Sequence, residues 1–404
     1  MGLDHPIQFQ ARLANLGRRL LHWVGVLLMF APAVIIRAIS PIYTIRIREI
    51  FSSRLGHFAS EPDMYLSARA ILHEPPRTLD LFYFDEHGAC NAQLAAMWKR
   101  RLIISPVFRY LDRAIRLLPG WRRHQVPWND VAGTDLRSKT APFLALSDAE
   151  HIQGEARLEE IAGAERRPVV CVFNRDTRYL AERYPGKDWS YHDYRDSNIS
   201  NYVPAMEWLA ESGYTVMRMG AAVADTFTTK NPHVIDYASK YHDDFMDVFL
   251  YAHCDFHVSA TSGPPHLGAL FRKPAAFINT APFLTTITTE CVHPDEVFIP
   301  KLYFSNLLGR CLTISEIVTA NLEDIGDGRR FAERGITLIE NDPQDLLSIT
   351  QEIEGIVTGR NRSSLEDRRL QAAFWKAAGI DAEAAKMYPQ PSPAFLRKHD
   401  EILF

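Results

Sequence analysis

Polar residues that follow the apolar runs in the second half of the chain are the strongest candidates for a ligand site. Residues 169–173 form a continuous, β-branched apolar run, which is typical of a parallel strand buried on both faces. In open α/β sheets, ligands bind at the carboxyl ends of the strands, so residues that follow successive strands share one edge. We therefore expect a ligand at this edge. The residues expected there are Asn174, Arg175, Asp176, Arg218, Gly220, Ser259, Thr261, Ser262 and Gly263.

The loop Thr261-Ser262-Gly263 precedes a predicted helix at 266–271 and has the chemistry of an anion site. It offers hydroxyl groups, backbone N–H groups and the positive end of a helix dipole, which suit a phosphate or diphosphate. Arg175 and Arg218 would add positive charge at the same edge. The alternative is an ordinary turn, since Ser, Gly and Pro are common turn residues. The loop lacks the Walker and G-x-G-x-x-G patterns, so neither an NTPase nor a dinucleotide oxidoreductase is supported.

Residues 188–198 form the densest cluster of polar and aromatic side chains in the sequence. Three aromatic residues are interleaved with charged ones, and aromatic surfaces beside hydrogen-bonding groups suit a sugar or a nucleobase. His192 with Asp193 or Asp196 could form an acid/base pair. The alternatives are a solvated loop and a metal site; we do not predict a metal, because H-x-x-x-H and D-x-D spacings are absent here. Further expected ligand contacts are Tyr191, Arg195 and Asn198.

A second candidate for acid/base chemistry is His57, in a break between hydrophobic segments of the first half. The adjacent Gly56 would allow the backbone to approach a ligand closely. His57 could then act as a base facing a cleft between domains, or it could be a capping or core histidine. Residues 85–88, which follow a predicted strand, are another candidate for the same cleft.

Alternating strands and helices position these residues, and they indicate a parallel, doubly wound sheet with right-handed crossovers. Residues 126–147 show little periodicity and contain Pro and Gly, which predicts a long loop there. Predicted strands lie at 78–84, 102–105, 169–173, 215–219, 256–259 and 275–279. Predicted helices lie at 91–101, 107–118, 150–164, 201–212, 243–253 and 266–271, with mostly helical stretches at 345–357 and 365–387.

The composition is that of a soluble globular protein with two or three domains. The chain has 404 residues, of which 47% are hydrophobic and 23% charged, so neither disorder nor an all-membrane architecture is expected. Its net charge of -4 gives no overall attraction to nucleic acid. The number of cysteines is odd and no C-x-x-C pair occurs, which favours a reducing compartment and no cysteine catalysis. They are Cys90, Cys171, Cys254, Cys291 and Cys311.

Residues 20–36 form a seventeen-residue run that contains no Asp, Glu, Lys or Arg, and the segments on either side of it are rich in arginine. This length is marginal for a membrane span, which needs about 20 apolar residues. Arginines on both sides suit a helix that lies in the interface of an anionic membrane, with Trp23 at the depth of the headgroups. A single span and a buried core helix are the alternatives. The flanking arginines are Arg12, Arg18, Arg19, Arg37, Arg46 and Arg48.

Several of these motifs resemble a family of bacterial glycosyltransferases, over about residues 50 to 320. The matching segments are 54–58, 90–91, 97–100, 174–220 with the specific motif at 188–197, 245–248, 262–263, 271–274 and 299–301. The resemblance implies a GT-B fold, in which two Rossmann-like domains face a cleft, and metal-independent sugar transfer to a surface-polysaccharide or lipid-linked acceptor. Ser262-Gly263 continues here as Pro264-Pro265, and two prolines remove backbone N–H donors from the loop.

We therefore predict an α/β, GT-B-like glycosyltransferase that uses a nucleotide-sugar substrate, with no cofactor, no metal and no nucleic-acid partner. The catalytic candidates are His57, Asp196 and His192. The expected location is the cytoplasm, peripheral to the inner membrane, with a single span as the alternative. Competing functions are a nucleotide-sugar epimerase or hydrolase and a non-catalytic, membrane-docked glycan-binding or assembly protein. The expected parts are an apolar, basic segment (1–50), an acceptor-side Rossmann-like domain (51–165), a nucleotide-sugar domain (166–345) and C-terminal helices (346–404).

Overall fold

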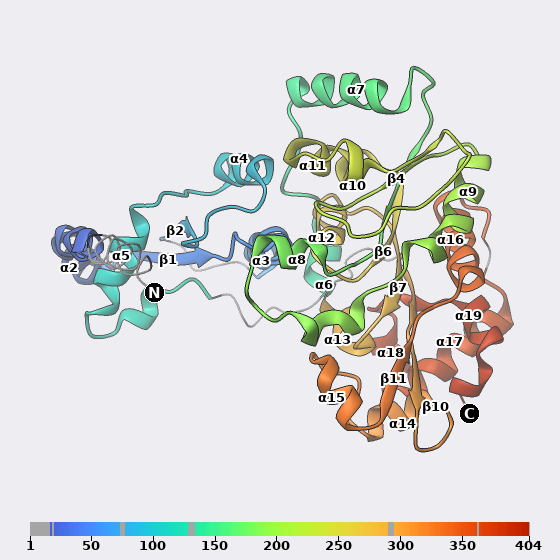
Figure 1. Ribbon diagram of the computed structural model, residues 1–404. Helices are drawn as coiled ribbons and strands as arrows, with labels where there is room; N and C mark the ends of the chain where they lie inside the picture. The colour runs from blue at the N-terminus through green and yellow to red at the C-terminus, as the bar shows by residue number, and fades with distance from the viewer. Residues whose placement is uncertain are drawn as a thin grey trace, which may run out of the picture.

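The computed structural model describes Gly17 and residues 20–72, 77–127, 134–289, 295–361 and 363–403. Its largest element is a parallel sheet of seven strands in the order β12-β8-β7-β6-β3-β4-β5 (Figure 1). Counted along the chain from β3, the first six strands have the order 3-2-1-4-5-6 of the doubly wound nucleotide-binding fold. The strands are β3 (Val169–Phe173), β4 (Thr215–Arg218), β5 (Val234–Ile235), β6 (Phe256–Ala260), β7 (Ala275–Thr280), β8 (Val297–Pro300) and β12 (Gln390–Pro391).

The continuous apolar run of β3 is explained by the burial of both faces of the sheet. Val170 and Val172 belong to one hydrophobic core, whereas Val169, Cys171 and Phe173 belong to the other. Successive side chains of a strand point to opposite faces, so apolar residues at every position of β3 fit a strand that is covered on both sides. The predicted strands 169–173, 215–219, 256–259 and 275–279 are confirmed within a residue.

Helices cover both faces of this sheet. On one side lie α9 (Val203–Glu211) and α16 (Pro343–Val357), and on the other lie α11 (Asp244–His253) and α12 (Pro265–Leu270). The remaining helices of this half are α8 (Arg178–Arg183), η2 (Ser190–Arg195), η3 (Ile199–Tyr202), α10 (Tyr237–Lys240), α13 (Phe283–Thr289), α14 (Ile314–Thr319), α15 (Gly328–Glu333), α17 (Leu365–Ala377), α18 (Ala382–Ala385), α19 (Pro393–Lys398) and η4 (Asp400–Ile402).

Several strands of this half differ from the sequence-based expectation. A small antiparallel sheet, formed by β9 (Leu302–Ser305), β10 (Arg310–Cys311) and β11 (Ile336–Ile339), was not predicted, and neither were β5 and β8 of the main sheet. The C-terminal region, expected to be helical, also contains β12, which pairs with β8 at the edge of the main sheet. These strands have two to four residues, which is too short for a clear period-2 pattern.

The first half contains a smaller parallel unit. The strands β1 (Thr44–Ile50) and β2 (Thr78–Phe84) pair along their whole length and are connected through α3 (Leu55–Ile71). Single bridges extend the pair, at Gln125 beside β1 and at Ile104 beside β2. The predicted strand at 102–105 is therefore only a bridge. Within the described residues, this half has two strands where the sequence led us to expect a Rossmann-like layer. Its other helices are α4 (Ala92–Arg101), α5 (Phe108–Arg116), η1 (Trp121–His124), α6 (Thr134–Ser138) and α7 (Asp148–Ala162).

β1 and α3 were not predicted, because both contain a residue type that is uncommon inside a buried strand or helix. Arg46 lies in the middle of β1, but it is buried and its Nε and Nη2 donate to Asp80 of β2 at 2.6 and 2.7 Å. Pro62 lies inside α3, where a proline removes a backbone hydrogen bond. The expected loop at 126–147 also contains α6, and its residues 128–133 lie outside the described residues.

The segment Leu20–Ile39 is helical and strongly apolar, with a mean hydropathy of 1.9. Its second part is α2 (Phe30–Ile39), which packs beside α5 at the end of the molecule remote from the large sheet (Figure 1). Only 11% of its most apolar window is buried, so the structure does not support a core helix. By length and composition the helix could cross a membrane. Arg12, Arg18 and Arg19, which precede it, lie outside the described residues.

The two halves of the chain are joined by an ion pair that is buried in the protein. Asp63 of α3 is 1% exposed and accepts hydrogen bonds from Nη1 and Nη2 of Arg272 at 2.9 and 3.1 Å. Arg272 follows α12, which lies against α3 (Figure 1). Nearby, Asn91 donates to the backbone oxygen of Asp244 at 2.9 Å. The ion pair therefore holds the middle of α3 against α12, the helix that follows β6 of the large sheet.

The buried His257 of β6 should make the stability of the fold depend on pH. Burial lowers the pKa of His257 to about 3, and its Nδ1 lies 2.9 Å from Oγ of Ser259. The unfolded chain would protonate this histidine below its ordinary pKa of about 6.5, whereas the folded protein would not until about pH 3. The contribution of the neutral His257 to the free energy of unfolding is therefore present above pH 6.5. It is lost as the pH falls, by about 2 kcal/mol between pH 6.5 and pH 5.

Chemical denaturation of the wild type and of a His257→Gln variant at pH 7 and pH 5 tests this expectation. Between pH 7 and pH 5, the free energy of unfolding should fall by less in the variant than in the wild type. His151→Gln, which changes an exposed histidine of α7, should keep the wild-type pH dependence. Identical losses in the wild type and in His257→Gln would contradict the assignment.

Candidate functional site

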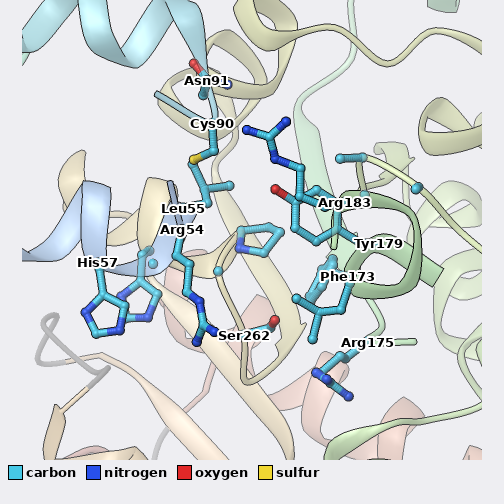
Figure 2. Close-up of a pocket in the computed structure, with 18 of the residues that line it drawn as sticks. Arg54, Leu55, His57, Cys90, Asn91, Phe173, Arg175, Tyr179, Arg183 and Ser262 are labelled. Carbon is cyan, nitrogen blue, oxygen red and sulfur yellow. The ribbon is translucent and has the colours of Figure 1, made fainter. Parts of the chain in front are cut away.

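A cavity of about 870 Å³ lies where the start of α3 meets the carboxyl edge of the large sheet. Its walls come from the ends of β3, β4 and β6, which are neighbours in the sheet. The strand order reverses between β3 and β6, the position at which doubly wound folds bind ligands. Figure 2 shows side chains from α3, from the segment before α4 and from α8 around this space. Lining segments include 54–57, 89–91, 173–176, 179–180, 182–184, 220–223 and 262–264.

The loop after β6 meets the first turn of α3 at two glycines. A Cβ atom on Gly56 would lie 3.0 Å from Cδ2 of His266, and a Cβ atom on Gly263 would lie 3.3 Å from the backbone N of Gly56. Neither position has room for a side chain without a shift of its neighbours. The contact brings Ser262 and Gly263 beside the N-terminus of α3, a helix with seventeen residues and no side-chain cap. Backbone N–H groups of a helix start therefore lie next to the predicted phosphate loop.

Five arginines line the cavity and give it a positive character. Within the described residues, Arg54, Arg183 and Arg195 make no ion pair with a carboxylate. Several acidic groups of the lining are already engaged in holding the protein together. Asp176, for example, accepts from the backbone N–H groups of Arg178 and Ala224 at 2.9 and 3.0 Å. Unpaired guanidinium groups in a cavity are suited to binding an anionic ligand. The other lining arginines are Arg137 and Arg175.

The segment 188–198 contributes His192 and Arg195 to the cavity. Nη2 of Arg195 donates to Nδ1 of His192 at 2.9 Å, so the proton of a neutral imidazole is on Nε2. Burial, together with the positive charges of Arg195 and Arg175, lowers the pKa of His192 to about 4. His192 is therefore neutral at pH 7 and can donate a hydrogen bond to a ligand. The contact anticipated with Asp193 or Asp196 is not the one that His192 makes.

Asp196 is engaged by a neighbouring cation instead. It forms an ion pair with Nη1 of the buried Arg175, which also donates to the backbone oxygen of His192 at 3.1 Å. Nζ of Lys301 donates to the backbone oxygen of Asp196 at 2.6 Å, and burial lowers the pKa of Lys301 to about 8. Asp196 does not line the cavity. Its carboxylate thus fixes Arg175 at the end of β3.

His57 lies in the first turn of α3, at the cavity wall. Its Nδ1 is 3.0 Å from Oε1 of Glu61, one helical turn further on, and the ring lies against Phe51 at 4.9 Å between centroids. The side chain of His57 is 52% exposed. The carboxylate orients the imidazole and leaves Nε2 for another partner, an arrangement found in histidines that act as bases. Glu61 was missed because the i, i+4 spacing is meaningful only once α3 is recognised as a helix.

The structure places five predicted ligand-binding residues outside the cavity lining. Arg218 is fully buried; its Nη2 and Nη1 donate to Asn174 at 3.1 Å and to Asp236 at 3.2 Å. This corrects the expectation that Arg218 meets the ligand directly, since it is the support of Asn174, which does line the cavity. Asn198 caps η3 through the backbone N–H of Ser200. Tyr191 packs on His192 at 3.9 Å between ring centroids. Ser259 and Thr261 are buried at the end of β6.

The remaining predicted residues do meet at the cavity. Asn174, Arg175 and Asp176 line it after β3, Gly220 lines it after β4, and Ser262 and Gly263 line it after β6. His57, His192 and Arg195 complete this set. Residues that the sequence analysis did not single out are Arg54, Glu61, Arg183 and His266. Arg54 lies with its guanidinium 5.1 Å from the ring centroid of Trp189, so it connects α3 with the 188–198 segment. Among the described residues, no group of three or more His, Cys, Asp or Glu could hold a metal ion.

No protein-family model and no curated protein matches this sequence. Among solved structures, the chain is similar to the ADP-heptose LPS heptosyltransferase II of E. coli, with a TM-score of 0.38, 13% identity and coverage of 76% of this chain and 98% of that one. It is also similar to a glycosyltransferase of family 9 from Veillonella parvula, with a TM-score of 0.40, 11% identity and coverage of 78% and 97%. A third similar structure is the iron-containing, dodecameric glycosyltransferase TibC of enterotoxigenic E. coli, with a TM-score of 0.29, 14% identity and coverage of 58% and 59%.

Proposed function

We propose that this protein is a metal-independent glycosyltransferase that moves a sugar from a nucleotide-sugar donor to a surface-polysaccharide or lipid-linked acceptor. In this proposal the two halves act as the facing domains of a GT-B-like enzyme, which works in the cytoplasm at the inner membrane. The observation that carries the proposal is the arginine-lined cavity at the strand-order reversal of a sheet with nucleotide-binding topology. Such a site combines an anion-binding edge with room for a nucleotide and a sugar.

The donor diphosphate would lie in the cavity, against the wall that the β6–α12 loop and the first turn of α3 form together. Ser262 and Gly263 offer a hydroxyl and backbone groups there, and Arg195 offers a guanidinium that has no carboxylate partner among the described residues. When the bond between the sugar and the diphosphate breaks, negative charge develops on the departing nucleoside diphosphate. Cationic side chains already in place stabilise that charge without rearranging. His192, as a neutral donor through Nε2, would add a hydrogen bond.

The acceptor hydroxyl would be activated by His57. Nε2 of His57 takes the hydroxyl proton while the acceptor oxygen forms a bond to the anomeric carbon and the nucleoside diphosphate leaves with the bonding electrons. Glu61 stabilises the imidazolium that results, through the contact at 3.0 Å. His57 suits this role better than the other two candidates. Asp196 is paired with Arg175 and does not line the cavity. His192 has a pKa of about 4, which makes it a weak base.

Incubation of the purified full chain with a panel of nucleotide sugars, with and without a membrane extract, tests the proposal. We expect nucleotide release and covalent attachment of the sugar only when an acceptor is present. Consumption of the donor without any acceptor would instead indicate an epimerase or hydrolase. Glycan binding with no consumption of any donor would indicate a binding or assembly protein.

Arg195→Ala should weaken the binding of the nucleoside diphosphate product about 10- to 100-fold, because a hydrogen bond to a charged group contributes about 1.5–3 kcal/mol. Binding of the corresponding nucleoside, which lacks phosphate, should change much less. Isothermal titration calorimetry measures both. Arg310→Ala is the matched control, since Arg310 pairs with Glu316 at the surface and neither residue lines the cavity. Equal weakening of nucleoside and diphosphate would refute a phosphate contact.

A further inference from the structure

The outer face of the helical segment Leu20–Ile39 is the largest run of exposed apolar side chains that the structure describes. Leu21, Leu27 and Leu28 are 70%, 71% and 69% exposed, and Ile35 is 61% exposed. A soluble protein does not leave so many large apolar residues in water on one helix without a partner. We define this surface as the apolar face. Its members are Leu20, Leu21, Trp23, Val24, Leu27, Leu28, Phe30, Val34, Ile35 and Ile39, and Ile42 continues it.

The opposite face of the same helix is packed against the protein. Val26, Ala33 and Ile36 are buried in a cluster with residues of β1, β2 and α5. A Cβ atom on Gly25 would lie 2.8 Å from the ring of Tyr110 in the α5 region, so the first part of the helix is also in close contact. The segment is thus attached along its length. It could not cross a bilayer without carrying α5, with Arg113 and Arg116, into the hydrocarbon.

Arginines surround the C-terminal end of the helix. Nε of Arg37 donates to the backbone oxygen of Pro119 at 2.8 Å, and Nη1 of Arg123 donates to Oγ of Ser40 at 3.2 Å. Arg122 is exposed beside them. An apolar surface with a cationic edge is the pattern of helices that lie in the interface of membranes with anionic lipids.

We infer that the apolar face docks on an anionic lipid bilayer, with the helix in the plane of the interface, and that the acceptor of the reaction is a lipid-linked saccharide in that bilayer. The second part rests on the proposed function. β1 begins five residues after α2 ends and leads to the cavity wall at Arg54 (Figure 1). Its seven residues span about 23 Å at roughly 3.3 Å per residue. The site would therefore lie close enough for a membrane-anchored saccharide to reach it.

Flotation of the full chain with vesicles tests the docking directly. The wild type should bind vesicles of phosphatidylcholine mixed with phosphatidylglycerol more tightly than vesicles of phosphatidylcholine alone. Leu27→Glu with Ile35→Glu should reduce binding at least about tenfold, because charged groups would then enter the hydrocarbon boundary. The matched control, Ile152→Glu with Leu307→Glu, changes exposed apolar residues of α7 and the β9–β10 turn and should bind like the wild type. Arg122→Glu with Arg123→Glu should remove the preference for the anionic vesicles.

Three results would overturn the inference. Equal vesicle binding by the Leu27/Ile35 variant and the control would show that another surface docks. Resistance of the membrane-bound protein to alkaline carbonate extraction would show a span. A dimer in size-exclusion chromatography that the Leu27/Ile35 variant loses, without vesicle binding by the wild type, would show a second copy on the apolar face. Nucleoside diphosphate binding, measured on the same samples, separates these results from a failure of the proposed function, because the substituted residues lie outside the cavity lining.

Discussion

Replacement of His57 by alanine is expected to lower kcat by about 10²- to 10⁴-fold, the usual contribution of a general base. The affinity for the sugar donor should stay close to that of the wild type, because the diphosphate is assigned to the β6–α12 loop and the arginines. Steady-state kinetics with the identified donor and acceptor, together with calorimetry of nucleotide binding, separate these two quantities. A His57→Ala enzyme with unchanged kcat would rule out His57 as the base.

Two further variants show whether the effect belongs to the His57–Glu61 pair. Glu61→Gln keeps the shape of the contact at 3.0 Å but removes the charge that stabilises the imidazolium. It should reduce kcat less than His57→Ala does, because the imidazole is kept and only the charge that stabilises the imidazolium is lost. His87→Ala is the control, since His87 is an exposed histidine after β2 that does not line the cavity. Its turnover should match the wild type.

Asp63→Ala is expected to lower the unfolding free energy by about 3–5 kcal/mol, the cost of leaving one partner of a buried ion pair without the other. Arg272 is 11% exposed in its side chain and would retain a positive charge among backbone oxygens of Arg137, Thr140 and Ala269. Because this pair joins α3 to the end of α12, its loss should loosen the cavity as well. Chemical denaturation, followed by circular dichroism, measures the change in stability.

The matched control for this stability prediction is Glu316→Ala. Glu316 also pairs with an arginine, Arg310, and it accepts from the backbone N–H of Thr313 at the start of α14, but both side chains of the pair are more than a third exposed. Exposed pairs of this kind contribute about 0–1 kcal/mol. A conservative change, Asp63→Asn, should fall between the two, since the amide oxygen can still accept from Arg272. Similar losses for Asp63→Ala and Glu316→Ala would show that the joint between the halves does not depend on this pair.

The sequence was most informative where burial is complete. β3 is covered on both faces and is apolar at every position, and β6 and β7 are buried along their whole length and mostly apolar, so these strands stand out from their surroundings. β1 and α3 were missed for the opposite reason. Arg46 is paired with Asp80, and the backbone oxygen of Phe58, which Pro62 cannot reach with an N–H group, accepts from Nε1 of Trp98. These partners are distant in sequence, and a local pattern carries no information about them. Glu61 was missed together with the helix that contains it.

The edge of the sheet chosen from the sequence is the edge at which the cavity lies, but several of the residues chosen there do not line the cavity. The carboxyl-end rule selects both Asn174 and Arg218, yet only Asn174 faces the cavity, while Arg218 lies beneath it and holds Asn174. Likewise His192 and Asp196 are close in sequence but have different arginine partners. Which of two neighbouring polar residues faces a ligand depends on tertiary packing, which proximity along the chain does not determine.

The contact between Gly56 and Gly263 has a consequence for the reaction cycle. His57 directly follows Gly56, and Ser262 directly precedes Gly263. Because the backbone at these two glycines is closely packed, no gap has to close to bring the base beside the phosphate loop. In the proposed reaction, the relative position of the acceptor hydroxyl and the leaving group would then be set before the substrates arrive. Any opening of the two halves would govern how the donor enters and the nucleotide leaves, and the chemical step would need no rearrangement at this point.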